Sequence, residues 1–166
     1  TTILRNISIS LPLTHRLRVR AHPGSRRPKV ELSIEARRLG NVFFDCDNSD
    51  FFELISLADI VFTVASSASL DAVIMGTPVI TFGNLPYLVG EHASPIRKCS
   101  NWEELPRLIS ECLEEGIRQK EIDSYFYSFL HHSEPMKKSP DIPDWLDSDF
   151  DPRKTPEWYD FGSDRA

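Results

Sequence analysis

Hydrophobic and polar positions along most of the chain repeat with the period of either a strand or a helix. Residues 59–65 are mostly apolar and are broken by Thr63, a pattern typical of a parallel strand buried on both faces. Residues 17–21 alternate apolar and polar side chains, which predicts a further strand. The expected strands are residues 17–21, 41–44, 59–65, 77–82 and 96–99, and the expected helices are residues 30–38, 51–58, 66–75, 100–113 and 121–130.

Particular residue types mark the ends of these helices. Ser49 or Asp50 is expected to cap the helix after it, because a short side-chain oxygen accepts hydrogen bonds from first-turn N–H groups. Ser100 is expected to cap a later helix, with Glu103 completing a capping box. Pro106 conflicts with an unbroken helix, so we expect it either to kink this helix or to begin a second one.

The alternation of strands and helices is the signature of βαβ units, so the sequence predicts an α/β fold with a parallel sheet flanked by helices. We expect one domain over residues 1–132. From residue 133 to residue 166 prolines are scattered among aspartates without periodicity, which predicts an irregular, extended C-terminal tail. Five aromatic residues in this acidic tail favour docking on another surface over free solvation.

Composition narrows the class of protein. Hydrophobic residues make up 40% of the chain, enough for a core, and the longest apolar run, residues 72–75, is too short to span a bilayer. The start lacks both an initiator Met and a signal peptide, so we expect a fragment or processed piece of a cytoplasmic protein. The three cysteines have no metal-ligand spacing, which fits a reducing compartment and predicts no metal site.

The formal net charge of −6 is unevenly distributed. Residues 15–38 are mainly basic, whereas the tail is acidic. Nucleic-acid-binding domains tend to be basic throughout, so this distribution argues against nucleic acid as a partner and allows a local anion site.

Two segments follow expected strands at the edge where ligands bind in parallel α/β sheets. His22-Pro23 follows the strand over residues 17–21, and Ser66-Ser67 follows the strand over residues 59–65 and begins a helix. A helix N-terminus and two hydroxyls favour a phosphate, and an imidazole nearby could donate to it. Simpler interpretations remain open: Ser66 as a helix cap, and His22-Pro23 as a turn.

Residues 66–83, which begin with Ser66-Ser67 and end with Phe82-Gly83, resemble the second-domain core of GT-B glycosyltransferases. The resemblance is closest to bacterial capsule polysaccharide proteins, including Kdo transferases and the sialyl- and polysialyltransferases with paired "HP" and "SS" motifs. His22-Pro23 matches the first motif and Ser66-Ser67 the second, and Pro86-Tyr87 extends the match. The resemblance covers roughly residues 10–115, and it implies a Rossmann-like half of a GT-B fold.

The resemblance also implies roles for individual residues. His22-Pro23 would contact the nucleotide of the donor, and Ser66 and Ser67 would hold its phosphate. Asp71 would bind ribose hydroxyls where many GT-B enzymes have a glutamate; an exposed helix residue is the alternative. Further phosphate contacts are expected from residues with donor groups near this edge, namely Arg20, Arg26 and Ser69.

The expected function is that of an enzyme, the donor-nucleotide half of a glycosyltransferase in capsular or surface polysaccharide biosynthesis. CMP-sugars such as CMP-Kdo are the favoured donors, a saccharide is the acceptor, and no cofactor is expected. In the resembling families the catalytic base lies in an N-terminal GT-B domain absent here, so no catalytic residue is assigned and the chain alone is expected to be inactive. Capsule enzymes work near the inner leaflet, so peripheral association of the protein with the inner face of the plasma membrane is also expected.

Two alternatives come from other classes of protein. The chain could be a non-catalytic α/β interaction module that binds a partner through its tail. It could also be a GT-B-like nucleotide-sugar epimerase or a polyol-phosphate transferase, since the same phosphate-binding turn would serve either reaction.

Overall fold

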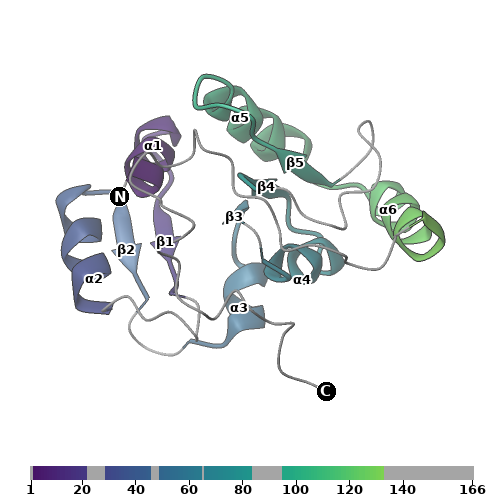
Figure 1. The fold of residues 1–166 in the computed structure, drawn as a ribbon, viewed down its shortest axis with the longest axis horizontal. Helices are drawn as coiled ribbons and strands as arrows, with labels where there is room; N and C mark the ends of the chain where they lie inside the picture. Colours follow the sequence, from purple (N-terminus) through teal and green to yellow (C-terminus); the bar gives the residue numbers. More distant parts are fainter. Residues whose placement is uncertain (1, 22–28, 46–48, 65, 84–94, 133–166) are drawn as a thin grey trace, which may run out of the picture. The chain divides into compact units, whose positions relative to one another are not determined.

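A computed structural model describes residues 2–21, 29–45, 49–64, 66–83 and 95–132 (Figure 1). The chain divides into two compact units, which we describe one at a time. The described part of the first unit lies within Thr1–Asn48, and the second unit is Ser49–Pro143. The predicted α/β class is confirmed: all paired strands are parallel and helices flank them, but the described strands form two small sheets instead of one. The predicted tail, residues 133–166, lies outside the described residues.

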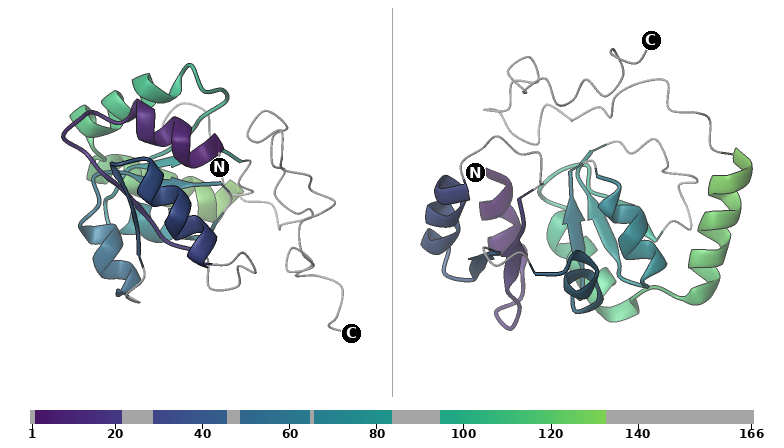
Figure 2. Two further views of the ribbon diagram at one scale, coloured as in Figure 1. Left: turned by 90° about the vertical axis from the view of Figure 1, so that its left-hand side faces the viewer. Right: turned by 90° about the horizontal axis from the view of Figure 1, so that it is seen from below.

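The first unit contains two helices and a two-stranded parallel sheet (Figure 2). Leu17 pairs with Val42 across this sheet, and both side chains are buried. Residues 2–10 form a helix that the sequence analysis did not predict, although Leu4 and Ile7 are buried at helical spacing. The elements are α1 (Thr2–Ser10), β1 (Leu17–Val19), α2 (Lys29–Arg38) and β2 (Val42–Phe44).

A pair of polar side chains fixes helix α1 against the start of β2. Ser8 Oγ donates to Asn41 Oδ1 at 2.5 Å, and Asn41 Nδ2 donates back to the Ser8 carbonyl at 3.0 Å. The Asn41 carbonyl also accepts from the backbone N–H of Leu17 at 2.9 Å. One asparagine therefore links the first helix to both strands.

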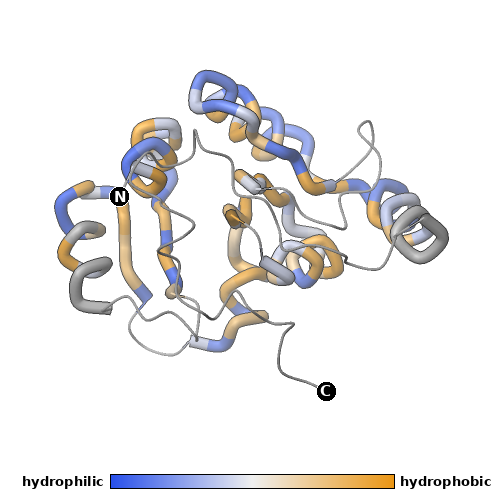
Figure 3. Tube along the Cα trace, in the orientation of Figure 1, coloured by the Kyte–Doolittle hydropathy of each residue, from blue (hydrophilic) through white to orange (hydrophobic). Residues whose placement is uncertain are grey.

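The second unit is built on a three-stranded parallel sheet in the order β3-β4-β5. The central strand is buried at all three residues, in agreement with the apolar colour of this region in Figure 3. The elements are α3 (Phe51–Ser56), β3 (Val61–Thr63), α4 (Ala68–Ile74), β4 (Val79–Thr81), β5 (Ile96–Lys98), α5 (Leu105–Glu115) and α6 (Gln119–His132).

The core of the second unit joins its sheet to three helices. Val73 of α4 and Val79 of β4 have no exposed surface, and Tyr125 brings helix α6 into the same cluster at 2% exposure. Burying side chains of this size contributes about 1.5–3 kcal/mol each. The cluster consists of Ile55, Ala72, Val73, Val79, Ile96 and Tyr125. No helix in the described ranges is long and apolar enough to cross a membrane.

Helix ends match the predictions in part. Asp50 caps α3, because its Oδ1 accepts from the N–H groups of Phe52 and Glu53, each at 2.9 Å. The predicted capping box of Ser100 and Glu103 is wrong: Asn101 Oδ1 accepts from the Glu104 N–H at 3.0 Å, and the Glu104 carboxylate accepts from the backbone N–H groups of Ser100 and Asn101.

Helix α5 begins only at Leu105, with Pro106 in its first turn. Of the two predicted outcomes at Pro106, a helix that begins near this residue is therefore the one observed. The reciprocal hydrogen bonds before the helix join Asn101 and Glu104, each one residue later than the predicted Ser100 and Glu103. A proline is well tolerated at this position because first-turn N–H groups have no partner inside the helix.

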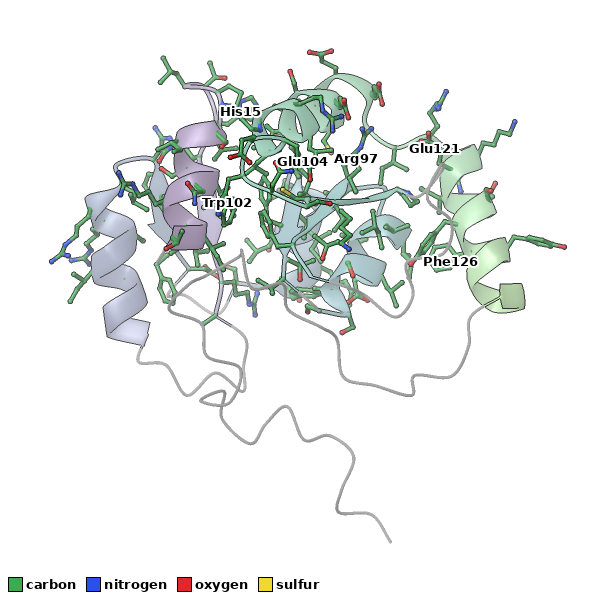
Figure 4. The ribbon with its side chains drawn as sticks, turned by 45° about the horizontal axis from the view of Figure 1, so that its top comes forward. His15, Arg97, Trp102, Glu104, Glu121 and Phe126 are labelled. Carbon is green, nitrogen blue, oxygen red and sulfur yellow. The ribbon has the colours of Figure 1, made fainter. Side chains whose placement is uncertain are left out.

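An ion-pair network ties β5 to α5 (Figure 4). Arg97 Nη1 lies 2.6 Å from Glu111 Oε2, and its Nη2 lies 2.7 Å from Glu115 Oε2. Burial lowers the pKa of Arg97, but the two carboxylates raise it by more, so the net direction is upward. The guanidinium therefore stays charged and holds the helix on the edge strand.

A buried hydroxyl provides a test of how the loop before β4 is held. Thr77 Oγ1 donates to the Ile55 carbonyl at 3.0 Å. Because Ile55 O still accepts from the Ala58 N–H at 3.1 Å, Thr77→Val should lower the free energy of unfolding by about 1 kcal/mol. Urea unfolding measures this loss. The exposed Thr14→Val control should change stability by less than about 0.5 kcal/mol; equal effects at the two positions would contradict the assignment.

Candidate functional site

The candidate site is the edge of the second unit's sheet where its three strands end. Because β3, β4 and β5 are parallel, their carboxyl ends share this edge, the usual place for ligands in such sheets. Ser66-Ser67 come shortly after β3, Gly83 after β4 and Cys99 directly after β5. These residues define the edge considered below.

Thr81, at the end of β4, fixes the backbone of this edge. Its side chain has no exposed surface, and its Oγ1 donates to the Val64 carbonyl at 3.2 Å and to the Gly83 carbonyl at 3.4 Å. The Thr81 carbonyl accepts from the Cys99 N–H at 2.8 Å. The segments that leave all three strands are therefore tied to one residue.

Ser66 and Ser69 build the turn between β3 and α4. Ser66 Oγ accepts from the Ala68 N–H at 3.2 Å, so its side chain bonds to the first residue of α4. The N-cap position itself is Ser67, one residue later than the simpler interpretation of Ser66 as the helix cap expected. The fully buried Ser69 donates its hydroxyl hydrogen to the Ser66 carbonyl at 2.6 Å. Both side chains thus act on the backbone of the turn itself.

Ser67 differs from its two neighbours. Its side chain is exposed and makes no capping hydrogen bond, although it stands at the N-cap position of α4. Asp71 lies four residues further on, in the first turn, and is partly exposed. Residues four apart share one side of a helix, so a hydroxyl and a carboxylate are presented together at this end of α4.

The other predicted site residues belong to the first unit. His22, Pro23 and Arg26 lie outside the described residues, whereas Arg20 is exposed just after β1. The predicted convergence of the His22 imidazole with Ser66-Ser67 on one anion therefore stays a prediction.

Aromatic rings that the sequence analysis missed line up near the same edge. Phe82 stacks on Phe62 with a centroid distance of 6.4 Å and approaches Trp102 at 5.5 Å. Phe82 is buried, whereas Phe62 and Trp102 keep part of their surface exposed. No short-range pattern in the sequence links these rings, because Phe62 lies in β3, Phe82 directly follows β4 and Trp102 lies between β5 and α5.

Cys99 carries a thiol, a group that can act as a nucleophile, but the surroundings of this thiol lower its reactivity. Its Sγ donates to the Asn101 carbonyl at 3.1 Å, and the side chain is buried. Burial, with the nearby charge of Glu104, raises the pKa of the Cys99 thiol to about 11. A nucleophilic thiolate is therefore disfavoured here. Within the described ranges no group of three or more His, Cys, Asp or Glu residues is placed to hold a metal ion.

The raised pKa values predict protection from alkylation. Burial also raises the pKa of Cys112, on α5, to about 11, so only about 0.1% of either thiol is ionised at pH 8. Iodoacetamide should leave both residues unmodified in the native protein at pH 8 and label both in guanidinium, as measured by peptide mass spectrometry. Fast native labelling of Cys99 would show that its thiolate is accessible and would restore it as a nucleophile.

Comparison with known proteins assigns no family to the chain. No protein-family model matches it, and neither a curated protein nor a solved structure does. A functional interpretation consequently depends on the chemistry of the described residues and on the motifs that they carry.

Proposed function

We propose that the chain is the donor-nucleotide-binding half of a glycosyltransferase that takes its sugar from a CMP-sugar, such as CMP-Kdo, to build a capsular or surface polysaccharide. The observation that carries the proposal is the exposed Ser67 hydroxyl, which stands at a strand-to-helix turn of a parallel α/β sheet and takes no part in capping. The resemblance of residues 66–83 to GT-B enzymes supplies the reaction class.

The three serines of the turn have different roles in this proposal. Ser66 and Ser69 hold the backbone, as their hydrogen bonds indicate. Ser67 donates its hydroxyl to the donor phosphate, and Asp71, on the same side of α4, accepts from ribose hydroxyls. A shorter carboxylate than the glutamate of the resembling enzymes is compatible with this role if the ribose lies close to the first turn.

Sugar transfer requires the bond between the anomeric carbon and the phosphate oxygen to break while an acceptor hydroxyl attacks the same carbon. Negative charge then develops on the leaving phosphate, where a fixed hydroxyl donor stabilises it more than it stabilises the bound substrate. The acceptor proton must pass to a base. We assign that base to a second GT-B domain, so this half contributes binding, orientation and charge stabilisation.

A matched pair of variants tests whether Ser66 stabilises the turn and Ser67 binds the nucleotide. Ser66→Ala removes the acceptor for the Ala68 N–H and should lower the free energy of unfolding by about 1 kcal/mol. Ser67→Ala removes no capping bond and should leave stability unchanged, but it should weaken CMP binding about tenfold, because a hydrogen bond to a charged phosphate is lost. Thermal unfolding and calorimetric titration measure the two effects.

The titration has internal controls. The half-domain alone should bind CMP only weakly, with a Kd of about 1 mM, and should bind UDP less well. Ser100→Ala, an exposed serine next to β5, should change neither stability nor affinity. Failure of both nucleotides to bind, or equal CMP affinity in the wild type and Ser67→Ala, would refute the proposal.

Turnover separates a transferase from an epimerase that uses the same turn. Joined to an N-terminal GT-B domain, the chain should release one CMP for each sugar transferred from a labelled CMP-sugar to a saccharide acceptor, as measured by chromatography of the products. Because the base is assigned to the other domain, this chain alone should release none. An isomerised sugar without transfer would identify an epimerase instead.

A further inference from the structure

One face of the β1-β2 sheet in the first unit carries arginines beside an exposed aromatic ring. Arg18 pairs in register with Phe43, and their side chains are 53% and 46% exposed. The neighbouring pair, Leu17 and Val42, is buried at 8% and 4%. Since side chains alternate across a sheet, the buried pair marks the packed face, and Arg18 and Phe43 lie on the other face with about half of their surface exposed.

Two further arginines lie directly before and directly after β1. Arg16 and Arg20 flank Arg18 at two-residue spacing and are both exposed. The Arg16 guanidinium carbon lies 5.2 Å from the centroid of the Phe43 ring, which is cation–π geometry. We call Arg16, Arg18, Arg20 and Phe43 the arginine face.

The described part of the first unit carries more basic than acidic residues, and one of its ion pairs includes Arg18 of the arginine face. Arg18 Nη2 lies 2.8 Å from Asp45 Oδ1, and the Asp45 side chain is only 2% exposed. Residues 2–21 and 29–45 together carry seven Lys and Arg against three Asp and Glu. The described part of the unit therefore has a net charge of +4, although the chain as a whole has −6.

The exposed side chains of the arginine face are suited to binding another protein segment. Parallel strands are normally buried on both sides, and half-exposed Phe43 leaves apolar surface in water. A suitable cover carries negative charge for the arginines and aromatic or apolar side chains for the Phe43 ring.

The chain itself contains a segment with this chemistry. Residues 141–161 hold seven acidic and two basic residues, a net charge of −5, together with five aromatic rings. We propose that this acidic, aromatic segment binds the arginine face of its own chain. Tethering favours it over a separate partner, because a tethered segment is present at an effective concentration of about 1 mM. This inference stands on its own and does not depend on the proposed glycosyltransferase function.

Amide hydrogen exchange on the intact chain tests the proposal. At low salt, amides in residues 141–161 should exchange about tenfold more slowly than in a synthetic peptide of the same sequence. The double charge reversal Arg16→Glu/Arg20→Glu should return them to the rate of the peptide. Arg37→Glu/Arg38→Glu makes the same charge change at two exposed positions in the last turn of α2 and should leave the slow exchange intact.

Salt and folding controls complete the experiment. Raising the ionic strength from about 0.05 M to about 0.5 M should speed exchange in the segment, because the attraction is screened. Slow exchange in residues 42–44 reports that each variant is folded. If the double reversal unfolds the unit, the single variant Arg16→Gln replaces it, because it keeps the Arg18–Asp45 pair. This variant should speed exchange in residues 141–161 about two- to fivefold.

Three results would overturn the proposal. The first is exchange in the segment as fast as in the free peptide. The second is equal protection in the two charge-reversed variants. The third is protection that disappears on dilution, since binding to a second copy depends on protein concentration whereas binding within one chain does not.

Discussion

Burial of strand β4 on both faces is the constraint that shapes the second unit. A buried strand must satisfy its backbone groups through its neighbours, so β3 and β5 pair with it on either side in parallel register. The Thr81 hydroxyl then ties the ends of β3 and β4 through the carbonyls of Val64 and Gly83. The turn that carries Ser66 and Ser67 lies where it does because of this arrangement, and the proposed phosphate contact depends on it.

Much of this unit could be predicted from the sequence because its signals are local. An apolar run bounded by turn residues predicted β3, and Asp50 was one of two expected caps. Helices α5 and α6 overlap the predicted helices over residues 100–113 and 121–130, with different ends. Gly76, with a φ of +78°, ends α4 in a conformation that glycine adopts at little cost. Each feature depends on neighbours a few residues away.

What escaped prediction depends on distant parts of the chain. The burial of Asp45 against Arg18 joins two strands, and the Phe62–Phe82–Trp102 row joins three segments. Helix α1 is held by Ser8 and Asn41, which are 33 residues apart. For the candidate site, the sequence indicated the serine turn as a whole, but only the hydrogen bonds distinguish Ser66 and Ser69, which serve the backbone, from Ser67, which does not.

The central claim is that a nucleotide phosphate binds at the turn between β3 and α4. Mapping amide chemical shifts by NMR during a titration with CMP tests it most directly. The account predicts that the largest shifts lie in residues 66–71, with little change around residues 100–104 at the end of β5. Shifts centred elsewhere, or no saturable shifts, would contradict it.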